Sequence, residues 1–238
     1  MSKVFIACHQ GLGDHILCNG IYREYASIND RCVIGVKKKY AETIRYMLSD
    51  VKNIKIVLLP ESKSWRYIRL WRIFYKSIGY KILGLGSQGL NFFPPGVRFD
   101  QNFYDQAKLD FNKRWTSFHF PRNKAKEKIL FEELQCETGK YIFLHEDNSR
   151  NFTINRNLIK TNLKIVSPIN NITKSNFFDY AFVIENAAEI HCIESSFAAL
   201  VESLQLDIKK FSHRYARHHA LNDFRHEFTY KSSWTIIT

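Results

Sequence analysis

The chain has 238 residues, and a hydrophobic content of 45% excludes an intrinsically disordered protein. With 35 Lys and Arg against 23 Asp and Glu, the formal charge of +12 favours an anionic partner: a nucleotide, a lipid headgroup or a nucleic acid. No stretch comes near the ~20 uninterrupted apolar residues of a membrane span. The five cysteines occur singly, without a CxxC pair, which argues against a zinc site or a disulfide framework.

The first half of the sequence alternates between strand-like and helix-like segments. Short apolar, β-branched runs predict strands at 4–8, 31–36, 54–59 and 80–85. Apolar residues at helical spacing predict helices at 14–27, 40–48 and 64–77. A loop rich in Gly, Pro and Phe is expected over 86–102, followed by a helical stretch over 103–115. This alternation predicts a parallel sheet with helices on both faces.

The second half repeats the alternation after a boundary expected near 116–123. Helices are predicted at 124–134, 177–187 and 196–204, and strands at 141–144, 164–167, 189–193 and 208–211. The last segment, 227–237, is ambiguous, and its β-branched residues favour a strand. The predicted fold class is therefore α/β, with two Rossmann-like doubly wound domains, 1–118 and 119–238, facing across a cleft.

A glycine-containing turn joins the first predicted strand to the first predicted helix. It reads Gly11-Leu12-Gly13-Asp14-His15, so backbone amides and a helix N-terminus point at whatever lies over the end of the strand. Asp14 is suited to take a proton from an acceptor hydroxyl. It is equally suited to cap the helix, and the two roles are compatible.

A polar loop follows the strand predicted at 141–144. His145, Asp147, Ser149 and Arg150 are expected at the carboxyl end of that strand, where Arg150 offers a planar fork to a phosphate oxygen. The alternative is an ordinary polar loop with an internal salt bridge.

Two further segments offer contacts to an anion. The strand-to-helix turn Glu194-Ser195-Ser196 presents hydroxyls and helix amides to a diphosphate, and Glu194 is placed to accept bonds from ribose or sugar hydroxyls. The alternative is a helix cap and nothing more. Arg214 and Arg217 are three residues apart, so on a helical turn they share a face and are placed to hold one anion.

Several common site types are not indicated. The adjacent histidines His218 and His219 are weak evidence for a metal, because the sequence places no third ligand. No two aspartates stand at positions i and i+2, the pair that usually holds the metal in single-domain glycosyltransferases. A GxxxxGK[ST] motif is also missing, which disfavours a P-loop kinase or ATPase. No metal or other cofactor is therefore expected.

The segment 64–80 combines aromatic and basic residues on one predicted helix. Its members are Trp65, Ile68, Trp71 and Tyr75, interleaved with Arg66, Arg69, Arg72 and Lys76. Such a helix suits a membrane surface or a lipid-linked substrate. The alternative is a helix packed on the sheet, with its arginine stems covering apolar surface.

The motif at 11–16 resembles the N-terminal GxGD motif of glycosyltransferases with the two-domain GT-B fold. Within that fold, the resemblance is to the heptosyltransferase-like group of lipopolysaccharide synthesis. The resemblance implies that Asp14 is the catalytic base towards the acceptor hydroxyl, and we count His15 beside it as a catalytic candidate. The segment 194–196 resembles the site where such enzymes hold the donor's diphosphate. The segment 145–150 is loosely similar to a loop of fucosyltransferase-like GT-B enzymes.

These observations predict a metal-independent glycosyltransferase. It would move a sugar from a nucleotide-sugar donor to a glycan or lipid-linked acceptor in cell-surface polysaccharide synthesis, by an inverting mechanism. Positive charge for the departing diphosphate would come from Arg150, Arg214, Arg217, the serines and helix amides. The N-terminus opens directly into a strand, so we expect cytoplasmic residence, peripheral on the inner membrane face through 64–80.

Two alternatives belong to other functional classes. A non-catalytic nucleotide or nucleotide-sugar binding protein of the same fold would bind the ligand without turnover. A basic nucleic-acid-binding protein is less favoured, because the basic residues are split among separate segments and no RRM, KH or helix-turn-helix signature is present. No nucleic-acid partner is therefore expected.

Overall fold

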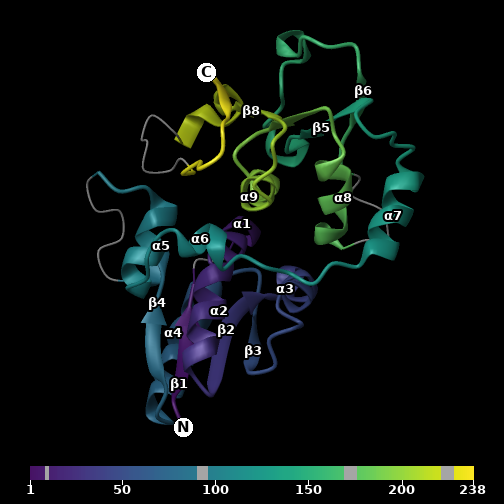
Figure 1. Ribbon diagram of the computed structural model, residues 1–238. Coiled ribbons are helices and arrows are strands. Elements are labelled where there is room, and N and C mark those ends of the chain that lie inside the picture. Colours follow the sequence, from purple (N-terminus) through teal and green to yellow (C-terminus); the bar gives the residue numbers. More distant parts are fainter. Residues whose placement is uncertain (9–10, 90–95, 169–175, 221–227) are drawn as a thin grey trace. The chain divides into compact units, whose positions relative to one another are not determined.

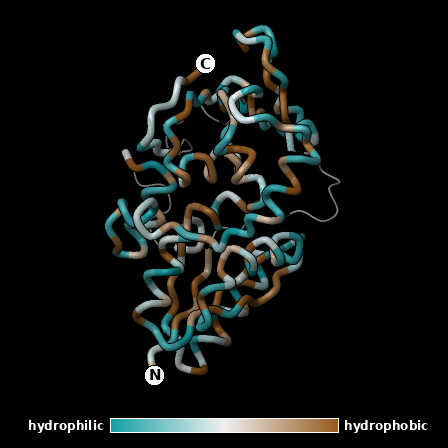
Figure 2. Tube along the Cα trace, turned by 45° about the vertical axis from the view of Figure 1, so that its right-hand side comes forward, coloured by the Kyte–Doolittle hydropathy of each residue, from teal (hydrophilic) through white to brown (hydrophobic). Residues whose placement is uncertain are grey.

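The computed structural model describes residues 1–8, 11–89, 96–168, 176–220 and 228–238 (Figure 1). The chain divides into two compact units, Met1–Pro121 (unit 1) and Arg122–Thr238 (unit 2), where the predicted domains are 1–118 and 119–238. Hydrophobic segments, brown in Figure 2, recur through both units with hydrophilic segments between them. Among the helices of the described residues, none combines the length and apolarity needed to cross a membrane.

Unit 1 contains a four-stranded parallel sheet. Its strands are β1 (Lys3–Ala7), β2 (Arg31–Lys37), β3 (Ile54–Leu59) and β4 (Lys81–Gly84), in the order β3-β2-β1-β4. The chain winds from β1 to β3 on one side and then returns to the other side of β1. The carboxyl ends of β1 and β4 are therefore neighbours, and Leu85 N donates to Ala7 O over 2.8 Å. In such a sheet this reversal marks the ligand-binding edge.

The helices of unit 1 differ in three places from the prediction. They are α1 (Leu12–Leu17), α2 (Asn19–Ile28), α3 (Ala41–Met47), α4 (Ser64–Ser77), α5 (Phe99–Ala107) and α6 (Lys113–Thr116), with 3₁₀ turns at Lys38–Tyr40 and Gly86–Gln88. The helix predicted over 14–27 is broken at Cys18, whose ψ of 1° lies outside the helical range. The stretch predicted over 103–115 is also two helices, because Lys108 adopts a left-handed φ of 55°. Within the expected loop 86–102, residues 99–102 are helical and 90–95 lie outside the described residues.

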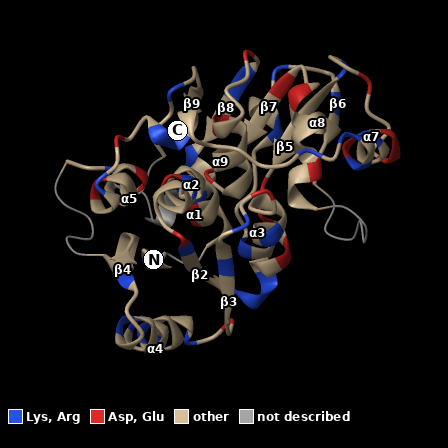
Figure 3. Ribbon diagram, turned by 60° about the horizontal axis from the view of Figure 1, so that its bottom comes forward, with Lys and Arg blue, Asp and Glu red and all other residues tan. Residues whose placement is uncertain are grey.

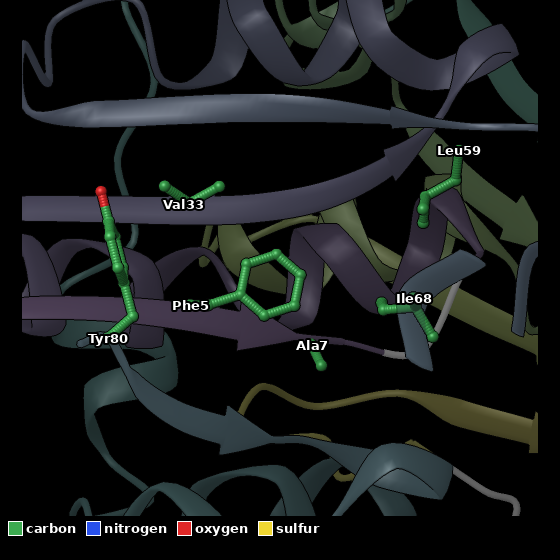
Figure 4. Packing of buried hydrophobic residues seen from close by; sticks show 6 residues of the cluster. All are labelled: Phe5, Ala7, Val33, Leu59, Ile68 and Tyr80. Atoms are coloured by element: carbon green, nitrogen blue, oxygen red, sulfur yellow. The ribbon is translucent and has the colours of Figure 1, made fainter. Parts of the chain in front are cut away.

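The core of unit 1 forms where α4 packs on the sheet. Buried Phe5, Ala7, Val33, Leu59, Ile68 and Tyr80 make one apolar cluster (Figure 4). The rings of Phe5 in β1 and Tyr75 in α4 stack with centroids 4.7 Å apart. Burying each large apolar side chain contributes roughly 1.5–3 kcal/mol. Because Ile68 and Tyr75 face this cluster, the opposite side of α4 faces away from the sheet.

Unit 2 contains a five-stranded parallel sheet. Its strands are β5 (Tyr141–His145), β6 (Lys164–Val166), β7 (Glu189–Cys192), β8 (Lys209–His213) and β9 (Thr235–Ile237), in the order β6-β5-β7-β8-β9. Its helices are α7 (Lys124–Glu133), α8 (Tyr180–Glu185) and α9 (Ser196–Ser203), with 3₁₀ turns at Asn148–Arg150, Arg156–Leu158, Phe177–Asp179 and Arg214–Ala220. The expectation of a strand within 227–237 is confirmed by β9. Both units are Rossmann-like, so the predicted α/β fold class is confirmed.

Candidate active site

In unit 2 the predicted site residues gather at the reversal point of the sheet. From β5 the chain passes to β6 on one side, and from β7 it passes to β8 on the other. His145 at the end of β5 is the register partner of Cys192 at the end of β7. Doubly wound sheets bind ligands in the crevice at such a point. The loops after His145 and Cys192 are therefore the edge where a ligand of unit 2 is expected.

His145 and Ser195 are joined across this edge. Ser195 Oγ lies 2.9 Å from His145 Nδ1 and also accepts a bond from Ala198 N over 3.4 Å, which makes it the cap of α9. Ser196 is the first residue of α9. Burial lowers the pKa of His145 to about 4, so its imidazole is neutral at pH 7. Its ring packs 4.6 Å from that of Phe197, whose position directly after the serines gave no signal in the sequence.

The loop after His145 contains an internal salt bridge, which was one of the two interpretations of this segment. Asp147 accepts from Ser149 Oγ over 2.6 Å and from Arg150 Nε over 2.6 Å. Although partial burial raises the pKa of Asp147, these two hydrogen bonds lower it below its ordinary value. The side chain of Arg150 remains 58% exposed, so pairing with Asp147 does not remove it from solvent.

Glu194 differs from the prediction. Its carboxylate is buried and accepts from Phe228 N and Tyr230 Oη, each over 3.4 Å. Arg214 Nε lies 3.8 Å from the same carboxylate, and Arg217 Nη1 donates to the backbone oxygen of Glu194. The expectation that Glu194 meets ribose or sugar hydroxyls is therefore wrong. A buried carboxylate needs charge and hydrogen-bond partners, and this one finds them within unit 2.

Arg214 and Arg217 do converge, but on Glu194. The 3₁₀ segment that carries them is kinked at Arg217, where φ is −119°. The guanidinium carbon of Arg217 lies 5.7 Å from the ring centroid of Phe152, and that of Arg150 lies 5.1 Å from the same centroid. Phe152 thus brings two arginines from separate segments to one ring. Nothing in the sequence pattern singled out Phe152.

A chain of hydrogen bonds runs beside this edge. His191 Nδ1 lies 2.9 Å from His213 Nε2, and His213 Nδ1 lies 3.2 Å from Tyr215 Oη. Tyr215 Oη in turn accepts from Asn155 N over 2.7 Å. The interpretation of His191 as a hydrogen-bonded strand residue is confirmed. The sequence missed His213 because the strand was expected to end at residue 211, whereas β8 extends to His213.

In unit 1, Asp14 lies at the start of α1, just after β1. Its Oδ2 accepts from Gly11 N over 2.9 Å, which is the capping role, and the side chain is half-buried. A Cβ added to Gly11 would lie 2.6 Å from Asp14 Oδ2, so the absence of a side chain there permits this contact. Gly13 lies in the first turn of α1. The role of Asp14 as the catalytic base remains a prediction.

His15 does not lie beside Asp14 as a second reacting group. It is buried, and its Nδ1 lies 2.8 Å from Tyr22 Oη on α2. Consecutive residues of a helix diverge by about 100°, which turns His15 towards the interior when Asp14 is at the edge. The expectation of His15 as a catalytic residue is corrected on this geometry. His15 holds α1 against α2.

No protein-family model matches the sequence, and no curated protein matches it. Solved structures share its fold. The glycosyl transferase family 9 protein from Veillonella parvula has a TM-score of 0.60 at 8% identity, covering 99% of this chain and 86% of that chain. An iron-containing dodecameric glycosyltransferase from enterotoxigenic E. coli has a TM-score of 0.53 at 10% identity, covering 100% of this chain and 62% of that chain. The E. coli ADP-heptose lipopolysaccharide heptosyltransferase II has a TM-score of 0.50 at 10% identity, with coverages of 89% and 84%.

Identities this low establish the fold alone. The chain has the GT-B fold of these glycosyltransferases, which confirms the resemblance at the level of fold. One neighbour is described as iron-containing, so independence of metal remains a prediction. Within the residues that the structure describes, no group of three or more His, Cys, Asp or Glu is arranged to hold a metal ion. The side chains of His218 and His219 lie outside the description.

Proposed function

We propose that the chain is a glycosyltransferase that takes a sugar from a nucleotide-sugar donor and passes it to a glycan or lipid-linked acceptor. The observation that carries this proposal is the gathering of His145, Ser195, Arg150 and Arg217 at the reversal point of unit 2, in a chain with the GT-B fold. The setting we propose is cell-surface polysaccharide synthesis on the cytoplasmic side of a membrane. We propose that this transfer uses no metal or other cofactor.

Unit 1 would supply the base. The Asp14 carboxylate takes the proton from the acceptor hydroxyl while the oxygen of that hydroxyl forms a bond to the anomeric carbon of the donor. The bond between that carbon and the diphosphate oxygen breaks on the opposite face, which inverts the configuration. The hydrogen bond from Gly11 N supports this role because it fixes the carboxylate at the beginning of α1.

Unit 2 would hold the departing nucleotide. Arg150 offers an exposed guanidinium to the diphosphate, and Arg217 lies against the same Phe152 ring. Negative charge grows on the diphosphate as the bond to the sugar breaks, so cations placed beforehand lower the barrier. Ser195 and Ser196 begin α9, where backbone N–H groups favour an anion. The neutral imidazole of His145 orients the Ser195 hydroxyl without adding charge.

A panel of nucleotide sugars tests this function directly. Melting curves of the full chain with UDP-, GDP-, CMP- and ADP-sugars will show which donor binds, since a ligand of the folded form raises the melting temperature. We expect one nucleotide class to raise it, and Arg150→Ala to remove the rise. Lys128→Ala is the matched control, because Lys128 is 73% exposed on α7. If no member of the panel shifts the wild-type curve, the proposal of a nucleotide-sugar donor fails.

One observation favours a second candidate, a non-catalytic nucleotide-sugar-binding protein of the same fold. Arg214 and Arg217, which the sequence places at the diphosphate, both contact Glu194. A donor site with fewer cations binds the nucleotide but stabilises the leaving diphosphate less. This candidate predicts a melting shift with a nucleotide sugar but no released nucleotide in the presence of any glycan acceptor, and the same shift in Asp14→Asn.

A further inference from the structure

The outward side of α4 carries an apolar ridge that the fold does not use. Ile68 and Tyr75 face the sheet, whereas the ridge comprises Tyr67, Leu70, Ile73, Phe74 and Ile78. These side chains are between 47% and 62% exposed. Positions 67, 70 and 74 follow helical spacing along α4, and Ile78 is the residue directly after the helix. A stripe of this kind is typical of a surface that contacts a partner.

A cationic groove lies next to this ridge, between α4 and the edge strand β4. It encloses about 1050 Å³ and is lined by Trp65, Arg69, Arg72, Ile73, Lys76, Tyr80, Lys81, Ile82 and Ser87. In the described parts of the chain, no carboxylate lies within ion-pair distance of Arg69, Lys76 or Lys81. Figure 3 shows α4 in blue and tan, without red. The groove therefore carries net positive charge.

The excess of basic over acidic residues extends into the sequence around the groove. Between Glu61 and Asp100 there is no acidic residue, while the basic residues there are Lys63, Arg66, Arg69, Arg72, Lys76, Lys81 and Arg98. Basic side chains near an anionic surface each contribute about 1 kcal/mol of attraction. Apolar side chains on the same helix contribute by leaving water for the boundary between headgroups and acyl chains.

We propose that α4 docks the protein on an anionic lipid bilayer, with the ridge inserted at the headgroup boundary and the groove bound to lipid phosphates. Charge complementarity selects this occupant. A second copy of the chain would bring one cationic groove near another, which opposes association. A nucleic acid would neutralise the groove but leave the apolar ridge in water. An anionic bilayer satisfies both features at once.

Co-sedimentation with lipid vesicles tests the proposal without donor or acceptor, so its result is independent of the proposed transfer reaction. We expect binding to vesicles that contain phosphatidylglycerol, weakening as salt rises, and no binding to pure phosphatidylcholine. Arg69→Glu with Lys76→Glu is expected to weaken the partition on the order of tenfold or more. The matched control, Lys128→Glu with Lys140→Glu, makes the same charge change at residues of unit 2 that are 73% and 71% exposed.

A second variant isolates the ridge. Leu70→Ser with Phe74→Ser removes apolar side chains that are 61% and 48% exposed, so folding is expected to persist, as an unchanged melting temperature would show. We expect it to bind anionic vesicles more weakly at every salt concentration. Three results overturn the proposal: no binding to anionic vesicles, equal binding to neutral ones, or equal loss in the charge control. If the wild type forms a dimer and binds no vesicles, and the ridge variant is a monomer, the ridge is the contact to a second copy of the chain.

Discussion

The carboxyl edges of the two sheets hold their polar residues in different ways. In unit 1, the Asp14 carboxylate is held by the N–H of Gly11, within one turn of the chain. In unit 2, side chains bond across elements: His145 meets Ser195, and Glu194 meets a segment more than thirty residues further on. A locally held group can be altered without unfolding its surroundings. A group that links several elements supports stability and binding together, so the two edges should respond differently to substitution.

The largest expected effect is on turnover, at the edge of unit 1. Asp14→Asn is predicted to lower the transfer rate by roughly 10²–10⁴-fold, since it removes the proposed general base. Stability should change by less than about 1 kcal/mol, because the Asn oxygen can still accept from Gly11 N at this cap. Initial rates of nucleotide release and melting curves of the two proteins measure both quantities.

Gly11→Ala sharpens the same test. Its Cβ would lie 2.6 Å from Asp14 Oδ2, so the carboxylate has to move while the residue is retained. We expect a lower rate with the melting temperature almost unchanged, in contrast to Glu194→Ala at the edge of unit 2. Full activity in Asp14→Asn would remove Asp14 from the mechanism, whatever Gly11→Ala does.

The next largest effect is on the stability of unit 2. Glu194→Ala leaves Arg214, itself only 22% exposed, beside an empty position, and breaking such a buried pair costs about 3–5 kcal/mol. The backbone of residue 228 also loses an acceptor. Hydrogen exchange of the β7 and β8 amides will report the loss in unit 2 separately from unit 1. Glu194→Gln keeps one acceptor oxygen without the charge and should lose less. Equal protection in the wild type and Glu194→Ala would contradict the linking role.

A smaller effect is expected at Arg150, which lies at the surface of the same edge. Arg150→Ala should weaken binding of the donor nucleotide by about 1.5–3 kcal/mol, the range for a hydrogen bond to a charged group. Because Arg150 is 58% exposed, its pair with Asp147 contributes no more than about 1 kcal/mol to folding. Isothermal titration with the nucleoside diphosphate measures the affinity. An unchanged affinity would place the diphosphate elsewhere on unit 2.

The elements of both sheets were predictable because their patterns are local. The bounds of β3 and α4, Ile54–Leu59 and Ser64–Ser77, equal those expected from β-branching and from helical spacing. The break between α1 and α2 was not predictable, since Cys18 has no helix-breaking chemistry of its own. Local pattern thus fixes what an element is, and its breaks depend on packing.

In the candidate site, too, local features were predictable from the sequence and long-range contacts were not. The meeting of His145 and Ser195 was predictable, because both follow parallel strands and such strands end at the same edge. The burial of Glu194 was not, since its partners Phe228 and Tyr230 lie far along the chain. Sequence reasoning therefore found the edge that a ligand is expected to use. It could not separate residues that face a ligand from those that hold the edge together.

The smallest effect is a pH dependence confined to unit 2. Burial lowers the pKa of His213 to about 4, with the nearby charges of His191 and Arg156 acting in the same direction, against an ordinary value of 6.5. The unfolded chain therefore binds a proton more readily than the folded one, and stability falls as the pH drops from about 6.5 towards 4. Above 6.5 both states are neutral and the contribution vanishes. Hydrogen exchange of β8 at pH 7.5 and 5 should show this loss in the wild type. In His213→Asn the loss should be smaller, although the variant starts less stable because the contact between His213 and Tyr215 is removed. An equal loss in both proteins would show that other groups, and not His213, carry the acid sensitivity of this edge.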